Sequence, residues 1–290
     1  MATTTTTYAK GGIPLRTITS SSLYSKPYDP SITKTYTPSI TSTLAPSTLA
    51  PSTISATRFL LAPPAPFLPT STLQIQTQGK ALFRLPSPPK ELEIPIFSLE
   101  TGRPVYLSVR GKRSSGNCTL VDVDVDSEEE RVLGSTEYHW GPGKCPIVRV
   151  NGVGKGGEEE EDEFEIQGKS LVSRTTVFEC RWGQFEWRYA GRKERGEGIS
   201  SLLVLEKVAD GGRVRVAQLV RGEETRSPGS TGSSAGNGGR LEMCLDDGDE
   251  KGKGQVVDEV TVVSTVLVML KKEIDRRRAL QIAMISGAGS

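Results

Sequence analysis

The sequence predicts a mainly β fold, in which an antiparallel β domain wraps around an apolar C-terminal helix and follows a disordered N-terminal tail. Three observations predict it: a tail rich in Ser, Thr, Pro and Ala, a series of short β-type runs from Leu73, and an apolar run from Val260 to Leu270. We therefore expect a tail over residues 1–72, a β domain with its helix over 73–278, and a short C-terminal tail over 279–290.

The N-terminal tail contains a small repeat, STLAPSTLAPST, between Ser42 and Thr53. Such a composition buries too little apolar surface to offset backbone ordering, which costs about 1 to 2 kcal/mol per residue. Up to Lys90 the only acidic residue is Asp29, as in mitochondrial transit peptides, yet arginine is scarce and the prolines oppose an amphipathic helix. The prediction is a disordered segment, and both a transit peptide and a phosphorylated linker remain open.

The β domain is predicted from runs of β-branched, aromatic and alternating apolar residues bounded by turn formers such as SSGN, GPG and DGG. Three polar inserts are expected to be solvated loops outside the core: NGVGKGGEEEEDE, EETRSPGSTGSSAGNGG and DDGDEKGKGQ. The predicted strands are ALFRL, LEIPIFSL, PVYLSV, CTLVDVDV, PIVRV, TTVFEC, FEWRYA, SLLVLEKV, RVRVAQLV and RLEMCL.

One hairpin holds much of the aromatic content, in FECRWGQFEWRYAGRKER from Phe178 to Arg195. A type II′ turn at Gly183-Gln184 would fix its register, because this turn favours glycine at its first central position. The aromatic residues would then share one face and pack in the core. The predicted cross-strand neighbours are Trp182 with Phe185, Cys180 with Trp187, Phe178 with Tyr189, Arg181 with Glu186, and Glu179 with Arg188.

The C-terminal helix is predicted from Val256 to Arg278, where Glu273 and Arg277 form a favourable i,i+4 pair. Its apolar part would span about 17 Å, well short of the roughly 30 Å of a hydrocarbon core, so we expect no transmembrane span. A helix that is apolar on nearly every face must be buried, and the β domain is the simplest host.

Composition excludes several classes of function. With 36 Lys plus Arg against 35 Asp plus Glu, the formal net charge of +1 gives no reason to expect a nucleic-acid partner. The four cysteines lie far apart and His139 is the only histidine, so we expect no zinc site and a reducing compartment such as the cytoplasm. Gly152-Val-Gly154-Lys-Gly156-Gly157 fits a dinucleotide motif, but an acidic run follows it, and we expect no cofactor.

No catalytic motif is present, and no catalytic residue is assigned. This favours a non-enzymatic function, although carboxylate pairs assembled from loops would escape a sequence reading. The candidate ligand-binding residues are two basic patches that would hold an anionic headgroup. They comprise Arg192, Lys193, Arg195, Arg276, Arg277 and Arg278.

Six segments between roughly Leu73 and Arg278 carry a resemblance to known proteins: ALFRLPSPPKELEIPIF, RSSGNCTLV, EYHWGPG, FECRWGQFEWRYAGRKER, LVRGEETRSPGSTGSSAGNGGRLEM and VLVMLKKEIDRRR. These segments resemble a group of fungal proteins that carry no assigned activity. Their layout is similar to the tubby C-terminal-like superfamily, which includes tubby, the LURP-one-related proteins and the phospholipid scramblases. The resemblance implies a closed antiparallel barrel around a central helix. Tubby itself binds phosphoinositide headgroups, although no basic position aligns residue by residue and the cysteine-rich segment of scramblases is missing.

The leading hypothesis is thus a non-enzymatic module that binds anionic phospholipid headgroups, in the cytoplasm or peripherally on a membrane. A soluble scaffold with a phosphorylated tail and unknown protein partners is the first alternative. An enzyme that uses loop carboxylates is the second.

Overall fold

The computed structural model describes residues 67–82, 85–88, 90–113, 115–123, 131–139, 141, 144–153, 159–170, 173–209, 212–245 and 256–287. The predicted disordered tail before residue 67, with its transit-peptide and linker alternatives, lies outside the described residues. So does the insert DDGDEKGKGQ.

The described residues form thirteen strands in one antiparallel sheet, ordered β7-β6-β5-β4-β3-β2-β1-β13-β12-β11-β10-β9-β8. Strands that follow one another in the chain are neighbours in the sheet except for β7 and β8, which stand at its two ends. The last strand, β13, pairs with both β12 and the first strand, β1. The strands are β1 (Ser71–Ile75), β2 (Glu93–Ser98), β3 (Pro104–Val109), β4 (Cys118–Asp122), β5 (Val132–Glu137), β6 (Ile147–Val153), β7 (Glu159–Glu165), β8 (Gln167–Gly168), β9 (Thr176–Cys180), β10 (Gly183–Tyr189), β11 (Ile199–Ala209), β12 (Gly212–Gly222) and β13 (Gly239–Met243).

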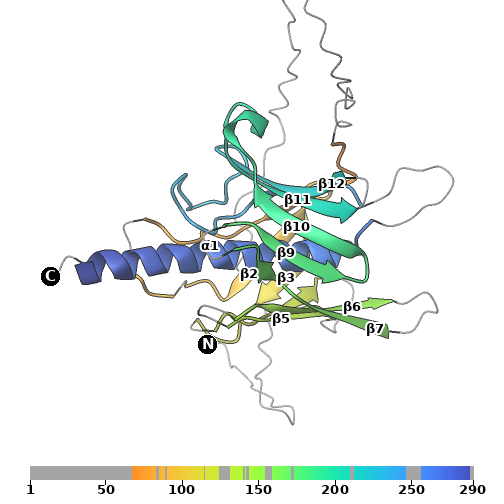
Figure 1. The fold of residues 1–290 in the computed structure, drawn as a ribbon, viewed down its shortest axis with the longest axis horizontal. Coiled ribbons are helices and arrows are strands. Elements are labelled where there is room, and N and C mark those ends of the chain that lie inside the picture. The colour runs from red at the N-terminus through yellow and green to blue at the C-terminus, as the bar shows by residue number, and fades with distance from the viewer. Residues whose placement is uncertain are drawn as a thin grey trace, which may run out of the picture. The chain divides into compact units, whose positions relative to one another are not determined.

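The sheet curls around one helix, α1 (Glu259–Gly287), which confirms the predicted mainly β fold with a central C-terminal helix (Figure 1). The barrel is nearly closed. At its seam the rings of Phe164 in β7 and Phe178 in β9 stack with centroids 5.2 Å apart. Beside them the backbone N–H of Arg181 donates to Asp162 Oδ2 at 3.0 Å. Side chains therefore join the two ends of the sheet.

Helix α1 begins where Asp258 caps it, since Asp258 Oδ1 accepts a hydrogen bond from the Thr261 amide at 2.7 Å. Every residue from Thr261 to Leu270 is buried, as the apolar run predicted. The buried hydroxyl of Thr265 accepts a hydrogen bond from Trp187 Nε1 at 3.1 Å, so both of these polar groups inside the barrel have a partner. In the described part of the chain, α1 lacks the uninterrupted apolar length that a membrane crossing needs.

The helix differs from its predicted bounds at both ends. It starts at Glu259 rather than Val256, and it continues nine residues beyond Arg278 to Gly287, so most of the expected C-terminal tail is helical. The first strand also starts at Ser71, inside the segment assigned to the N-terminal tail. Alanine, leucine and isoleucine after Arg278 favour continuing the helix, and no proline or glycine stops it before Gly287.

Several predicted strands and loops are wrong. The described residues of ALFRL, which are Ala81, Leu82 and Leu85, lie outside any strand, whereas STLQI and VLGSTE form strands. Most of the acidic run, expected in a loop, lies in strand β7, which pairs with β6. The serine- and glycine-rich segment 223–239 does not hang outside the core, because Ser227, Ser234 and Asn237 in it are buried.

The predicted register of the aromatic hairpin is also wrong. β9 and β10 pair Cys180 with Gly183 and Phe178 with Phe185, so the connection is Arg181-Trp182. Gly183 follows the turn with φ of 110° instead of lying inside it. A turn of ordinary residues followed by a glycine with positive φ is a common alternative hairpin connection.

The observed register of the hairpin changes the partners of its charged side chains but keeps its aromatic face in the core. Glu186 now lies opposite Val177 rather than Arg181, and it forms ion pairs with Arg213 and Lys169 at 2.9 and 3.0 Å. The predicted core packing is confirmed for the inward-facing aromatic residues Phe178, Phe185 and Trp187, which are all buried.

Candidate functional site

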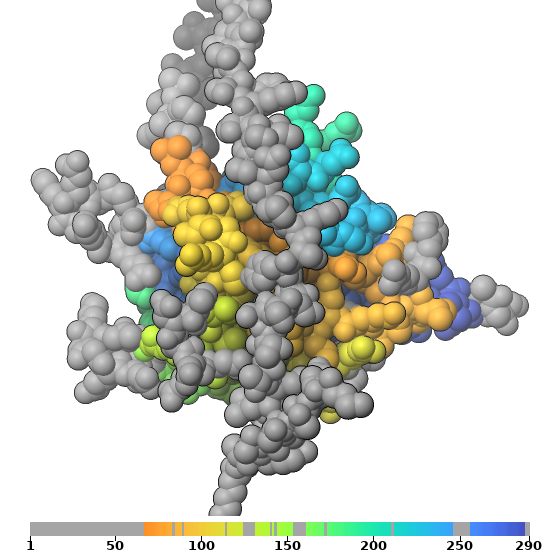
Figure 2. Space-filling model, turned by 180° about the vertical axis from the view of Figure 1, so that it is seen from behind, coloured from red at the N-terminus to blue at the C-terminus, as the bar shows by residue number. Residues whose placement is uncertain are grey.

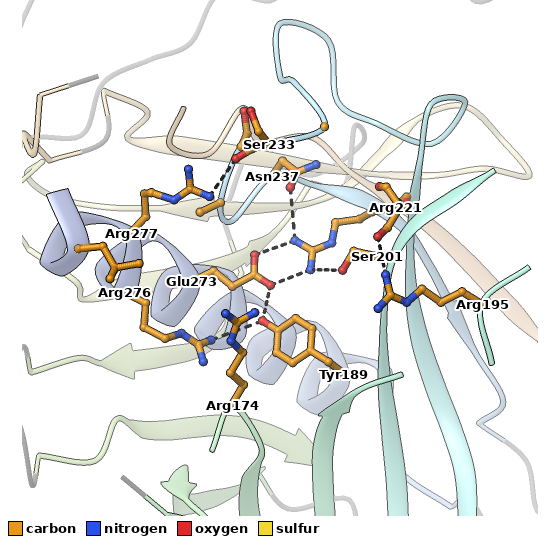
Figure 3. Close-up of a pocket in the computed structure, with 15 residues that line it drawn as sticks. Arg174, Tyr189, Arg195, Ser201, Arg221, Ser233, Asn237, Glu273, Arg276 and Arg277 are labelled. Atoms are coloured by element: carbon orange, nitrogen blue, oxygen red, sulfur yellow. Dashed lines mark hydrogen bonds and ion pairs between the residues drawn. The ribbon is translucent and has the colours of Figure 1, made fainter. Parts of the chain in front are cut away.

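A cavity of about 380 Å³ opens where α1 leaves the barrel (Figure 3). Its walls come from four places: the segment before β9, strands β10 to β12, segment 223–239, and the face of α1 around Glu273. Five arginines and a single carboxylate, that of Glu273, line it. We call it the arginine pocket, after Arg174, Arg195, Arg221, Arg276 and Arg277.

The floor of the pocket is a buried ion pair. Both terminal nitrogens of Arg221 donate to Glu273 at 2.7 Å, in a two-pronged arrangement that fixes both side chains. Arg221 also donates to Ser201 Oγ at 3.1 Å and to Asn237 Oδ1 at 3.3 Å. Its Nε is buried and has no hydrogen-bond partner among the described residues.

This pair is held in its charged form. Burial alone would raise the pKa of Glu273, but hydrogen bonds and charge from Arg221, with the Tyr189 hydroxyl and the Gly236 amide, hold that pKa below its usual range. Burial likewise opposes the charge on Arg221, and Glu273 outweighs it and raises the Arg221 pKa. Since the two charges cancel each other, the remaining four arginines set the potential of the pocket.

Tyr189 links this floor to the mouth of the pocket. Its hydroxyl donates to Glu273 Oε1 and accepts from Arg276 at 3.4 Å. Burial and the neighbouring Glu273 carboxylate raise the pKa of Tyr189, so the hydroxyl keeps its proton. The guanidiniums of Arg174 and Arg276 lie 5.9 and 6.0 Å from the ring centroid, where a cation–π contact holds them near the opening.

The four arginines around the mouth have no carboxylate within 4.0 Å among the described residues. Arg195 donates to the Ala190 and Ser200 carbonyls at 3.2 and 2.8 Å, and Arg277 donates to the Ser233 carbonyl at 3.0 Å. One terminal nitrogen of Arg277 is buried without a partner in the described chain. The carbonyls orient the guanidiniums of Arg195 and Arg277 without neutralising their charge. The pocket therefore attracts anions.

The structure brings three of the six predicted ligand residues together, because Arg195, Arg276 and Arg277 all line the pocket. Arg192 lies in the 3₁₀ turn η1 (Arg192–Glu194) and lines an adjoining hollow of about 390 Å³ that also includes Arg195.

The other two predicted residues lie elsewhere. Lys193 is exposed in the same 3₁₀ turn and lines neither hollow. Arg278 points to a different side of α1, where it donates to the Pro86 carbonyl at 3.2 Å and pairs with Asp275 at 3.4 Å.

Sequence reasoning missed Arg174 and Arg221. Arg174 precedes β9 and Arg221 lies at the end of β12, outside the two basic patches, and only the curvature of the sheet brings them to α1. One feature of the sequence could have indicated Arg221. It follows the apolar run AQLV, and a cation there needs a buried partner if the strand lies in the core.

Among the described residues, no group of three His, Cys, Asp or Glu side chains is placed to hold a metal ion.

No protein-family model, no curated protein and no solved structure matches this chain.

Proposed function

We propose that this chain is a non-enzymatic binding module that holds the phosphorylated headgroup of an anionic lipid in the arginine pocket. The observation that carries the proposal is the set of four guanidiniums around one opening that have no carboxylate partner among the residues that the structure describes. Arginine matches phosphate oxygens through paired N–H donors, and such charge-assisted hydrogen bonds are about twice as strong as neutral ones. The buried Arg221–Glu273 pair beneath them keeps the site in shape before the ligand arrives.

The size of the pocket supports a small polar ligand. Its volume of about 380 Å³ is near the lower end of ligand sites, which suits a sugar phosphate headgroup. The acyl chains of such a lipid would stay outside. The alternative of an enzyme with paired carboxylates finds less support here, because the oxygens of Glu273 accept hydrogen bonds from Arg221.

Membership of the tubby C-terminal-like superfamily is part of the proposal. The curled antiparallel sheet around an apolar helix supports it, as does a basic pocket beside that helix. A cytoplasmic location at the inner face of a membrane follows from the same proposal. The scaffold alternative concerns the tail before residue 67, which the described residues do not include.

Titration calorimetry with inositol 1,4,5-trisphosphate tests the headgroup site. We expect binding that weakens as salt rises, because exposed charges are screened. The double substitution R276Q/R277Q removes two guanidiniums of the mouth and should weaken binding at least about tenfold.

The matched control is R103Q/R113Q, which removes the same charge from two exposed arginines outside the pocket. This control should change the affinity less than about twofold, as expected for screened surface charge. Equal losses in the two variants would reduce the binding to a net-charge effect. No binding by the unmodified protein at low salt would remove the proposal.

A further inference from the structure

The last turns of α1 present an unusual surface. Beyond Arg278 the helix leaves the barrel, and its large apolar side chains are exposed instead of packed. We call residues 279–287 the apolar turns. Their exposed fractions are 57% for Leu280, 41% for Ile282, 64% for Met284 and 57% for Ile285. Figure 2 shows the blue end of α1 at the margin of the molecule, beyond the orange segment that precedes β2.

The apolar turns continue the helix face that lines the arginine pocket. Glu273, Arg276, Arg277 and Leu280 all line the pocket, and Met284 follows Leu280 by four residues, so it lies on the same stripe. Along the axis Met284 lies about 10 Å beyond Arg277. A ligand in the pocket would therefore sit directly beside an exposed apolar surface.

The apolar turns are held in place at their base. Gln281 is buried and donates to the Leu82 and Ala81 carbonyls at 2.8 and 3.3 Å. The segment that it contacts adds two more exposed apolar side chains, Leu82 and Leu85, with exposed fractions of 37% and 77%. The contacts fix the direction of the helix, so its end cannot fold back onto the barrel without breaking them.

We infer that the apolar turns insert into the interfacial layer of an anionic membrane while the arginine pocket holds a lipid headgroup; the inference rests on the proposed function. Arginines without a carboxylate partner among the described residues complement an anionic surface, and residues 279–290 include no charged side chain that would oppose insertion. The nine residues after Arg278 extend about 13 Å. That length crosses the headgroup layer, roughly 5 to 8 Å on each side, and reaches the acyl boundary.

The arginine pocket and the apolar turns would each make a weak contact with the membrane, and the two contacts would act together. A headgroup in a pocket is exchangeable, and a short apolar segment alone gives marginal, reversible attachment, whereas the two signals combined hold a protein on a membrane. The alternative partner for these exposed apolar side chains is a second copy of this chain. The adjoining arginine pocket disfavours a second copy, because two like-charged pockets would face each other across the contact.

Vesicle sedimentation tests the inference. The vesicles contain phosphatidylcholine with about 5% phosphatidylinositol 4,5-bisphosphate, and the double substitution M284Q/I285Q makes two exposed positions polar outside the pocket lining. We expect vesicle binding to fall at least about tenfold, while affinity for soluble inositol 1,4,5-trisphosphate stays within about twofold. The matched control L68Q/V214Q changes two other exposed apolar residues and should bind vesicles as the unmodified protein does.

A depth measurement adds an independent readout. The unmodified protein supplies the background emission of its three tryptophans. The emission that M284W adds to this background should shift to the blue and be quenched by brominated acyl chains when these vesicles are present. If the added emission stays unquenched with vesicles bound, insertion is contradicted.

The outcomes separate the two proposals. If soluble inositol trisphosphate fails to bind the unmodified protein, the proposed function fails. If it binds and M284Q/I285Q leaves vesicle binding unchanged, the inference fails alone. A dimer in sedimentation equilibrium that M284Q/I285Q dissociates, with vesicle binding unaffected, would assign the apolar turns to a second copy and overturn the inference.

Discussion

At the scale of single residues, the buried pair of Arg221 and Glu273 fixes the position of the pocket. Arg221 belongs to β12 and Glu273 to α1, so their hydrogen bonds tie the sheet to the helix at the point where the helix leaves the barrel. Gly236 adds its amide to Glu273 at 2.8 Å. A side chain at Gly236 would lie 2.5 Å from the Leu270 carbonyl oxygen, so only glycine lets segment 223–239 approach the helix this closely.

We predict that Glu273→Gln lowers the free energy of unfolding at pH 7 by about 3 kcal/mol, because it leaves the buried Arg221 charge without a counter-charge. Urea denaturation measures the change. The matched control is Glu197→Gln on the exposed turn after η1, where a surface carboxylate should change stability by less than about 0.5 kcal/mol.

The same variant tests a pH dependence. Because the folded-state pKa of Glu273 is lowered, its stabilising contribution is present above the unfolded pKa of about 4.3 and is lost as pH falls below it. The difference in stability between the unmodified protein and Glu273→Gln should therefore be largest near neutral pH and shrink below about pH 4. A difference that grew on acidification would contradict the charged state assigned to the pair.

At the scale of secondary-structure elements, α1 has two halves with opposite environments. Residues Thr261 to Leu270 are enclosed by strands, whereas Ile282, Met284 and Ile285 are exposed. A backbone amide in the enclosed half can exchange its hydrogen with solvent only when the barrel opens. The amides of the exposed half exchange when the end of the helix frays.

Hydrogen exchange followed by mass spectrometry measures this contrast. We predict that peptides from 261–270 exchange as slowly as the most protected strands, and that peptides from 280–287 exchange at least about a hundredfold faster. In the presence of the anionic vesicles, only the second group should gain protection. Rapid exchange across 261–270 in the folded protein would contradict the enclosed helix and with it the barrel.

The elements also show what the sequence could predict. The helix was predicted because an apolar run with no polar face has to be enclosed and because Glu273 and Arg277 pair at helical spacing. The hairpin register was not, because Gly183 suits both positions in a turn and only the packed neighbours decide between them. Strand β7 was missed because its glutamates suit a loop equally well until β6 supplies a hydrogen-bonding partner.

At the scale of the whole molecule, the arginine pocket forms because the sheet curls around α1. Arg174 precedes β9, Arg221 ends β12 and Arg277 belongs to α1, and no local pattern in the chain relates them. The basic patches at Arg195 and Arg276 to Arg278 were visible because each lies within a few residues. The sequence therefore predicted three of the five arginines of the pocket, and the fold supplied the other two, the counter-charge and the remaining walls.

Closure itself depends on side chains at one seam. β7 and β8 end the strand order, so β7 meets β9 through the stack of Phe164 on Phe178 and the contact of Arg181 with Asp162. Phe178 in turn stacks on Phe185 at 5.3 Å, which extends the ring contacts into the core. Removing the first ring should therefore loosen the two ends of the sheet before it affects the strands opposite them.

We predict that Phe164→Ala lowers the free energy of unfolding by about 3 to 5 kcal/mol, as expected for a buried phenylalanine. Phe164→Leu keeps most of the apolar volume and should cost about 1 kcal/mol. Hydrogen exchange gives the location: amides of β7 and β9 should exchange faster in Phe164→Ala at a pH where β12 and β13 stay protected. Uniform acceleration through all strands would mean that the seam does not open separately and that the barrel behaves as one cooperative unit.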